Sequence, residues 1–215
     1  MPRYDTILFD LDGTILFTLP DIAASLNHAL TLYDRPVQPI EAVRSFIGNG
    51  TRRLVARALP KGEEDEVFSA VCEEHARYYA AHWQDETRPY PGIEALFAEL
   101  KRRGIALGVV TNKTHSDACA MIRSLFGTTV DITIGKKDGC RPKPAPDAVD
   151  AAIKELHTAR ERTLYVGDSE VDFQTAQNAG MDCVLVSWGY RDRDILEKLP
   201  APALIDAPEE LLKYL

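Results

Sequence analysis

The sequence has few clusters of positive charge and no paired cysteines. Of its 215 residues, 25 are Lys or Arg and 33 are Asp or Glu, giving a formal net charge of -8 at pH 7, and the longest basic run is 101–103. Because a nucleic-acid surface needs concentrated positive charge, this composition argues against a nucleic-acid partner and favours a small diffusible ligand. The four cysteines form no Cys-x-x-Cys pair, so we expect no zinc knuckle and no disulfide framework, and a reducing, cytoplasmic compartment fits.

Long apolar runs are absent as well. Asp5, Asp10 and Asp12 interrupt the apolar stretch near the amino terminus, so the sequence predicts no signal peptide, and no later run is long enough to span a bilayer. A Gly-x-Ser-x-Gly elbow is missing and the five histidines show no metal-ligand spacing, which argues against a serine nucleophile and a histidine metal site. We expect a soluble protein, monomeric or homodimeric, without a membrane partner.

Short apolar runs alternate with helical patterns along most of the chain. The runs at 6–9, 105–110, 163–166 and 183–186 are typical of buried parallel strands. Apolar residues recur at helical spacing in 93–103, 116–125, 146–156 and 170–179. This alternation predicts an α/β fold with a doubly wound parallel sheet.

One interval breaks the alternation. From about residue 20 to 85 the apolar spacing predicts at least three helices and no strand. We interpret it as a helical cap, residues 17–88, inserted into an α/β core formed by 1–16 and 89–215. The stretches around 17–20 and 89–92, where proline and glycine disfavour continued helix, are the expected hinges.

Two acidic residues end the first predicted strand. Asp10 and Asp12 lie where ligands bind in open α/β sheets, at the carboxyl end of a strand, and residues two apart in an extended chain project to the same side. Gly13 then allows a tight turn. Since two close carboxylates repel unless a cation or a shared proton relieves them, this pair favours a metal site or split acid and base roles. A turn with a capping Asp is the structural alternative.

Three further segments supply polar side chains at strand ends or before helices. Thr111 and Asn112 follow the second strand, where they could contact a phosphate or simply cap a helix. Lys143 stands between two prolines that restrict where its ammonium points, although an isolated lysine is usually a solvated surface charge. Asp168 and Asp172, four residues apart, are expected on one face of a helical turn, where their oxygens favour a hard cation such as Mg²⁺.

These four elements, in this order, resemble the haloacid dehalogenase superfamily of aspartyl-phosphate phosphatases from about residue 6 to 189. The resemblance implies a Mg²⁺-dependent hydrolase acting on a small phosphorylated metabolite, with magnesium as its cofactor. It also implies a role for each matching residue: nucleophile Asp10, general acid and base Asp12, phosphate contacts Thr111 and Lys143, and metal ligands Asp10, the Asp12 carbonyl and Asp168, with Asp172 supporting the metal shell or Lys143.

Within the superfamily the sequence is most similar to the phosphoglycolate phosphatases, through segments 18–21, 46–50 and 188–190. The likeness implies that the turn Gly48-Asn49-Gly50, with Arg52 nearby and Asn112 in the core, contacts the substrate when the cap closes; a simple interhelical turn is the alternative reading. Phe17 departs from the group, which usually has an acidic residue at this position, so the hinge chemistry is expected to differ.

Other functions share much of this chemistry. A phosphomutase of the β-phosphoglucomutase type would form the same aspartyl phosphate, and a pyrophosphatase or a nucleotidase of the superfamily would use the same core. A dehalogenase is disfavoured because it needs neither Asp12 nor a phosphate-neutralising magnesium ion. A receiver-like or non-catalytic phosphate-binding module is disfavoured by the inserted cap and by the presence of every expected catalytic residue.

Overall fold

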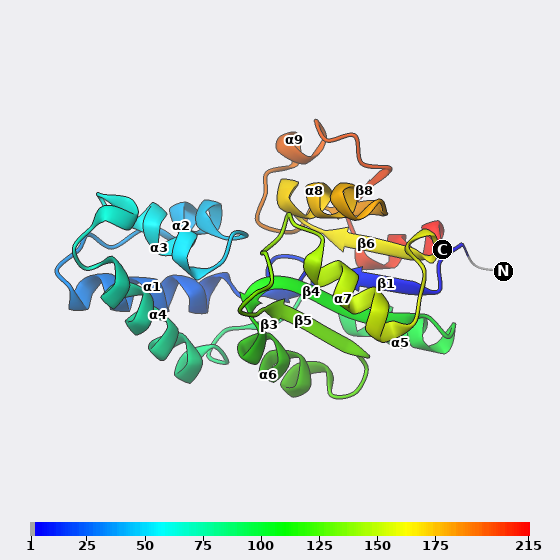
Figure 1. Ribbon diagram of the computed structural model, residues 1–215, viewed down its shortest axis with the longest axis horizontal. Helices are drawn as coiled ribbons and strands as arrows, with labels where there is room; N and C mark the ends of the chain where they lie inside the picture. Colours follow the sequence, from blue (N-terminus) through cyan, green and yellow to red (C-terminus); the bar gives the residue numbers. More distant parts are fainter. Residues whose placement is uncertain (1–2) are drawn as a thin grey trace. The chain divides into compact units, whose positions relative to one another are not determined.

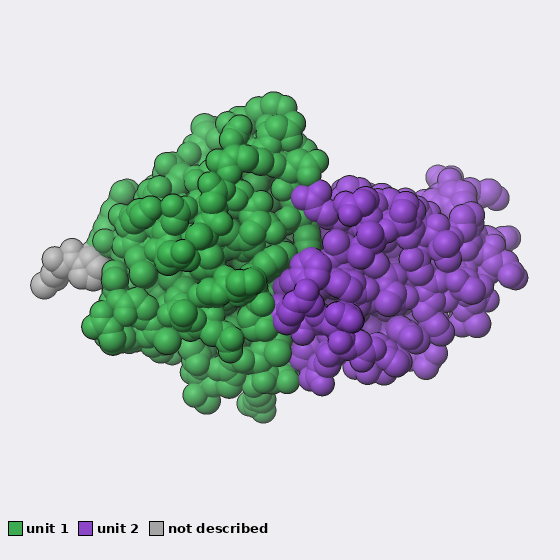
Figure 2. All heavy atoms as spheres, turned by 180° about the vertical axis from the view of Figure 1, so that it is seen from behind, with its two compact units in different colours: residues 1–16, 89–215 green, residues 17–88 purple. Residues whose placement is uncertain are grey.

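The computed structural model describes residues 3–215, which form two compact units. One, here the core unit, comprises the described part of Met1–Leu16 together with Pro89–Leu215. The other, here the insertion, is Phe17–Arg88. Figure 2 shows the two units in different colours.

A parallel sheet organises the core unit. Within the described residues it has six strands in the order β5-β4-β1-β6-β7-β8, and every neighbouring pair is parallel (Figure 1). The strands are β1 (Thr6–Phe9), β4 (Ala106–Thr114), β5 (Ile132–Lys136), β6 (Thr163–Gly167), β7 (Asp182–Val186) and β8 (Ala203–Ile205). β1 lies between β4 and β6 and is buried along its whole length, as expected for a continuous apolar run covered on both faces.

Helices cover both faces of this sheet. The core-unit helices are α5 (Ile93–Arg102), α6 (His115–Phe126), α7 (Asp147–Leu156), α8 (Glu170–Ala179) and α9 (Arg193–Leu196), with 3₁₀ turns at Arg160–Arg162 and Pro208–Tyr214. On one face Phe97 of α5 packs between Phe9 and Phe126, with ring centroids 5.2 Å and 5.1 Å away. On the other face Leu8 shares a core cluster with Val149 of α7 and with residues of α8.

The insertion is helical, and its long first and last helices pack against each other. Its elements are α1 (Leu19–Leu32), α2 (Ile40–Phe46), α3 (Thr51–Ala58), a 3₁₀ turn at Gly62–Glu64 and α4 (Phe68–His82). At its ends the chain passes through β2 (Leu16–Phe17) and β3 (Arg88–Pro89), which pair with each other. The buried Asp21 carboxylate accepts the backbone N–H of Thr87 at 2.8 Å, which fixes the returning segment. Phe17 lies under the Arg88 guanidinium, 4.9 Å from ring centroid to Cζ.

The predicted α/β fold is confirmed, and the four predicted strands and four predicted core helices all occur, with ends that differ by a few residues. β5 and β8 were not predicted, because β5 is a partly exposed edge strand and β8 has three residues, so neither gives a continuous apolar run. None of the described helices combines the length and the apolar character that crossing a membrane requires.

Candidate active site

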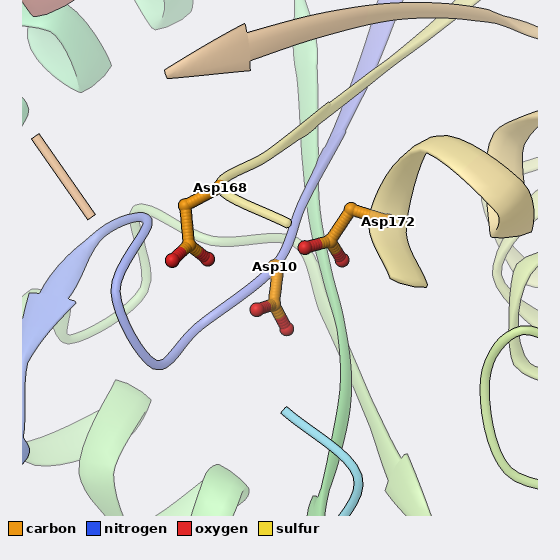
Figure 3. Close-up of side chains that lie close together, drawn as sticks. All are labelled: Asp10, Asp168 and Asp172. Atoms are coloured by element: carbon orange, nitrogen blue, oxygen red, sulfur yellow. The ribbon is translucent and has the colours of Figure 1, made fainter. Parts of the chain in front are cut away.

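Three buried carboxylates meet at the carboxyl ends of the central strands. Asp10 directly follows β1, and its backbone N–H bonds the carbonyl of Val166 in β6 at 2.9 Å. Asp168 follows β6, and Asp172 lies in the first turn of α8. One carboxylate oxygen from each of these three aspartates lies within 4.8 Å of the other two, and Figure 3 shows the three side chains lying close together. The sheet thus brings together residues that are far apart in the sequence.

Lys143 joins this group from the loop before α7. Its Nζ lies 2.7 Å from an oxygen of Asp10 and 2.7 Å from an oxygen of Asp172, and its side chain is 3% exposed. Asn112 fixes the loop, since its amide oxygen accepts the Lys143 backbone N–H at 2.8 Å and its amide nitrogen donates to the Lys143 carbonyl at 3.1 Å. This contact favours a positioning role for Asn112 over the direct substrate contact expected from the sequence.

Asp172 is held mainly by Ser169, which lies three residues before it in the sequence. Its Oδ2 accepts the backbone N–H and the hydroxyl of Ser169, at 3.2 Å and 2.5 Å, in a reciprocal capping box at the start of α8. Its Oδ1 accepts from Lys143. Because each Asp172 oxygen accepts two hydrogen bonds, Oδ2 from Ser169 and Oδ1 from Lys143 and the Tyr165 hydroxyl, Asp172 is better suited to hold Lys143 than to bind a metal. The prediction that Asp168 and Asp172 share a helical face was wrong: α8 begins at Glu170, so Asp168 precedes the cap, and the turn between strand and helix brings the two acids together.

Asp168 is fixed by a hydrogen bond to each of its oxygens. The Thr14 hydroxyl donates to Oδ1 at 3.2 Å and the Tyr190 backbone N–H donates to Oδ2 at 2.7 Å. Gly189 lets this loop approach, since a Cβ there would lie 2.3 Å from the Asp168 Cβ and 2.4 Å from Oδ2. A carboxylate oxygen has lone pairs for more than one contact, so Asp168 remains able to bind a cation.

The buried group formed by Asp10, Asp168, Asp172 and Lys143 has an excess of negative charge. When all four groups are ionised, the three carboxylates and the Lys143 ammonium carry a net charge of -2. Burial raises the pKa of Asp10 to about 8, in spite of Lys143, and the neighbouring acids add to the rise. Burial and then the Asp172 charge raise the pKa of Asp168 to about 7. For Lys143, burial alone would lower the pKa, but Asp10 and Asp172 outweigh it and raise the pKa well above the usual value.

This set of donors fits a divalent cation of the hard class. Oxygen ligands are those that Mg²⁺ prefers, and it commonly takes only one or two protein carboxylates. Asp10 and Asp168 would hold such an ion, and its two positive charges would match the net negative charge of the buried group.

β4 departs from regular pairing at the edge of this site. Its register against β5 shifts between Val110 and Thr114, where four residues of β4 advance for two of β5. Inside the shift, the Thr111 hydroxyl oxygen accepts the backbone N–H of Lys113 at 3.2 Å, which leaves the hydroxyl hydrogen for another acceptor, such as a phosphate oxygen. The Lys113 ammonium lies 3.1 Å and 3.2 Å from the two oxygens of Asp12. The sequence alone does not indicate this contact, because a lysine after a strand is usually a solvated surface charge.

Comparisons with known proteins show which family the chain belongs to. The family model of the haloacid dehalogenase-like hydrolases matches residues 7–186. The chain belongs to this family. A phosphoglycolate phosphatase of Pseudomonas savastanoi pv. phaseolicola is 33% identical over 207 residues, covering 93% of this chain and 76% of that protein. One of Mesorhizobium japonicum is 32% identical, covering 92% and 89% of the two chains. A crystal structure of a proposed phosphoglycolate phosphatase from Lactobacillus delbrueckii subsp. bulgaricus has a TM-score of 0.93 at 34% identity, covering 97% of each chain.

Gly48, Asn49 and Gly50, which the sequence predicts to contact the substrate, form a turn in the insertion, and Arg52 lies in the helix that follows. The turn lies between the end of α2 and the start of α3, and Gly48 and Gly50 have φ angles of 115° and 80°, which favour glycine. Asn49 lies between them. Arg52 contacts the insertion itself, with its guanidinium 4.6 Å from the Phe68 ring centroid and 3.3 Å from a Glu63 oxygen. A substrate contact by these residues remains a proposal.

The close approach of Gly189 to Asp168 gives a steric test of the site. We expect Gly189→Ala to displace Asp168, because the added Cβ would overlap its side chain, and to lower kcat/KM by about a hundredfold, the usual cost of misplacing a site group by about 1 Å. Gly104→Ala is the control: its Cβ would meet nothing within 4 Å, although the φ of +75° makes it slightly strained. Phosphatase assays and thermal unfolding of both variants make the comparison, and an unchanged kcat/KM in Gly189→Ala would contradict it.

Proposed function

We propose that this hydrolase is a Mg²⁺-dependent phosphatase that hydrolyses a small phosphate monoester, phosphoglycolate being favoured, through a phosphoryl group carried on Asp10. The observation that carries the proposal is the buried Asp10 carboxylate, 2.7 Å from the Lys143 ammonium and grouped with Asp168. The names of the relatives, which are phosphoglycolate phosphatases at 33% and 32% identity, favour that substrate.

In the first step an oxygen of Asp10 attacks phosphorus. The bond between phosphorus and the ester oxygen breaks as the new bond to the Asp10 oxygen forms, and the departing oxygen takes a proton from Asp12. Lys143 and the Thr111 hydroxyl would contact the equatorial phosphoryl oxygens, where negative charge is concentrated. Asn112 keeps Lys143 in place through the two hydrogen bonds to its backbone.

In the second step water releases phosphate. Asp12, now ionised, takes a proton from the water as its oxygen attacks phosphorus, and the bond between phosphorus and the Asp10 oxygen breaks. Asp10 is regenerated as a carboxylate and Asp12 as an acid, so the cycle closes with one water consumed. A bound Mg²⁺, held by Asp10, the Asp12 carbonyl and Asp168, would offset negative charge between the nucleophile and the phosphoryl oxygens.

A screen of phosphorylated metabolites with magnesium present tests this function. The panel contains phosphoglycolate, sugar phosphates, nucleotides and pyrophosphate, and the readout is inorganic phosphate released. We expect clear turnover of at least one monoester, with phosphoglycolate preferred. Transfer of the phosphoryl group to a sugar, without release of phosphate, would instead identify a phosphomutase, and no turnover of any member would contradict the proposal.

Removal of divalent cations provides a separate prediction. Because the excess negative charge around Asp10 would repel an anionic phosphate ester, we expect EDTA to lower kcat by at least about a hundredfold, in line with the loss of a main electrostatic contribution. Added Mg²⁺ should restore turnover, while the circular dichroism spectrum stays the same throughout. Full activity in protein shown to be metal-free by elemental analysis would contradict a metal requirement.

A further inference from the structure

Lys113 is a cation of the core unit that the proposed reaction leaves without a role. Its Nζ contacts both oxygens of Asp12, at 3.1 Å and 3.2 Å, and the two side chains are 9% and 14% exposed. The ammonium is therefore mostly removed from water. A desolvated lysine is costly unless an anion lies beside it, and Asp12 supplies that anion here.

The backbone holds Lys113 in this position. It lies within the register shift of β4, and its N–H is bonded to the Thr111 hydroxyl. On the neighbouring strand, Gly135 allows the backbones to approach, since a Cβ there would lie 2.7 Å from the Lys113 carbonyl oxygen and 2.6 Å from the His115 Cα. The ammonium is thus placed by the sheet itself.

The position of Lys113 relative to Asp12 puts it on the leaving-group side of the reaction. If Asp12 donates its proton to the departing oxygen, the atoms that follow that oxygen in the substrate lie close to the groups that contact Asp12. A carboxylate on the carbon next to the ester oxygen would therefore lie within reach of the Lys113 ammonium, which has three N–H donors.

We propose that Lys113 is a specificity-determining residue that binds an anionic group on the leaving alcohol, so that the preferred substrates are phosphate monoesters with a carboxylate adjacent to the ester carbon. The Lys113 ammonium would lie between two carboxylates, that of Asp12 and that of the substrate. A single ammonium suits a monoanion such as a carboxylate. This inference rests on the proposed function and assigns part of the substrate choice to the core unit.

Two esters of equal length test the inference: phosphoglycolate, and 2-hydroxyethyl phosphate, in which CH₂OH replaces the carboxylate. In Lys113→Met we expect the ratio of kcat/KM for phosphoglycolate to kcat/KM for 2-hydroxyethyl phosphate to fall by about tenfold or more, the usual size of a lost charged hydrogen bond. Most of the change should appear in KM. Lys113→Arg, which keeps the charge, should retain more of the ratio than Lys113→Met.

The control is Lys154→Met, which removes an exposed lysine from α7 and should change neither ester. An equal loss on both esters in Lys113→Met would overturn the inference, because it would mean that Lys113 only supports Asp12 or the fold. If Lys113→Met does not fold, Lys113→Gln replaces it. Equal kcat/KM values of the unaltered enzyme for the two esters would also overturn the inference while leaving the phosphatase function intact, whereas no turnover of any ester would contradict the function itself.

Discussion

Asp10→Asn is expected to abolish turnover, with kcat lowered by at least about a thousandfold, as for other lost nucleophiles, while the fold is kept. The amide has nearly the shape of the carboxylate but lacks the negative charge that attacks phosphorus. Lys143 retains a partner in the variant, because its second ion pair, with Asp172 at 2.7 Å, does not involve Asp10. The measurement is phosphate release under saturating substrate, together with thermal unfolding to show that the variant is folded.

The matched control for this variant is Asp150→Asn. Asp150 lies on α7, is exposed and pairs with Arg160 at 2.8 Å, so the same chemical change should leave turnover unaltered there. Near-normal turnover in Asp10→Asn would remove Asp10 from the mechanism and would overturn the proposed function.

Lys143→Met is expected to remove activity and to destabilise the protein. The side chains are similar in length, but the variant leaves the buried Asp10 and Asp172 without their shared cation. Breaking a buried ion pair by removing one partner costs about 3–5 kcal/mol, so the free energy of unfolding in urea, measured without divalent cations, should fall by about this amount. Phosphate release should fall at least about a hundredfold, because a contact to the phosphoryl oxygens is lost.

A second substitution separates the two effects of Lys143→Met. Adding Asp172→Asn removes one of the two carboxylates that lost their partner, so we expect the double variant to recover part of the free energy of unfolding without recovering activity. A double variant that regains neither, together with a single variant as stable as the unaltered protein, would show that the Lys143 ion pairs contribute little to the fold.

The sequence was most informative about acidic residues that directly follow a predicted strand. Asp10 and Asp168 could be predicted to meet, because the carboxyl ends of parallel strands share one edge of the sheet. Lys143 was assigned to the site through the family resemblance, because the strand before its loop, β5, was not predicted. Asp172 was identified for an incorrect reason. The spacing from Ser169 to Asp172 is that of a capping box, which explains the place of Asp172 better than a shared helical face does.

Other features depend on contacts that no local pattern encodes. Lys113 contacts Asp12 from the stretch where β4 changes register against β5, an edge strand that the sequence did not predict. Gly189 is remote in sequence from Asp168, so its steric role is visible only in three dimensions. The apolar pattern and the motifs therefore predict which strand ends contain the site residues. The contacts that hold those residues in place are seen only in the folded structure.

The central place of β1 has a consequence for the order in which the protein is completed on the ribosome. β1 is synthesised first, yet its partners in the sheet are at 106–109 and 163–166. All of 17–88, a unit with its own internal helix packing, emerges before either partner exists. β1, which ends just before Asp10, must therefore wait until 163–166 has been synthesised, and a nascent chain that ends before β6 would have a complete insertion but no position for Asp168 beside Asp10.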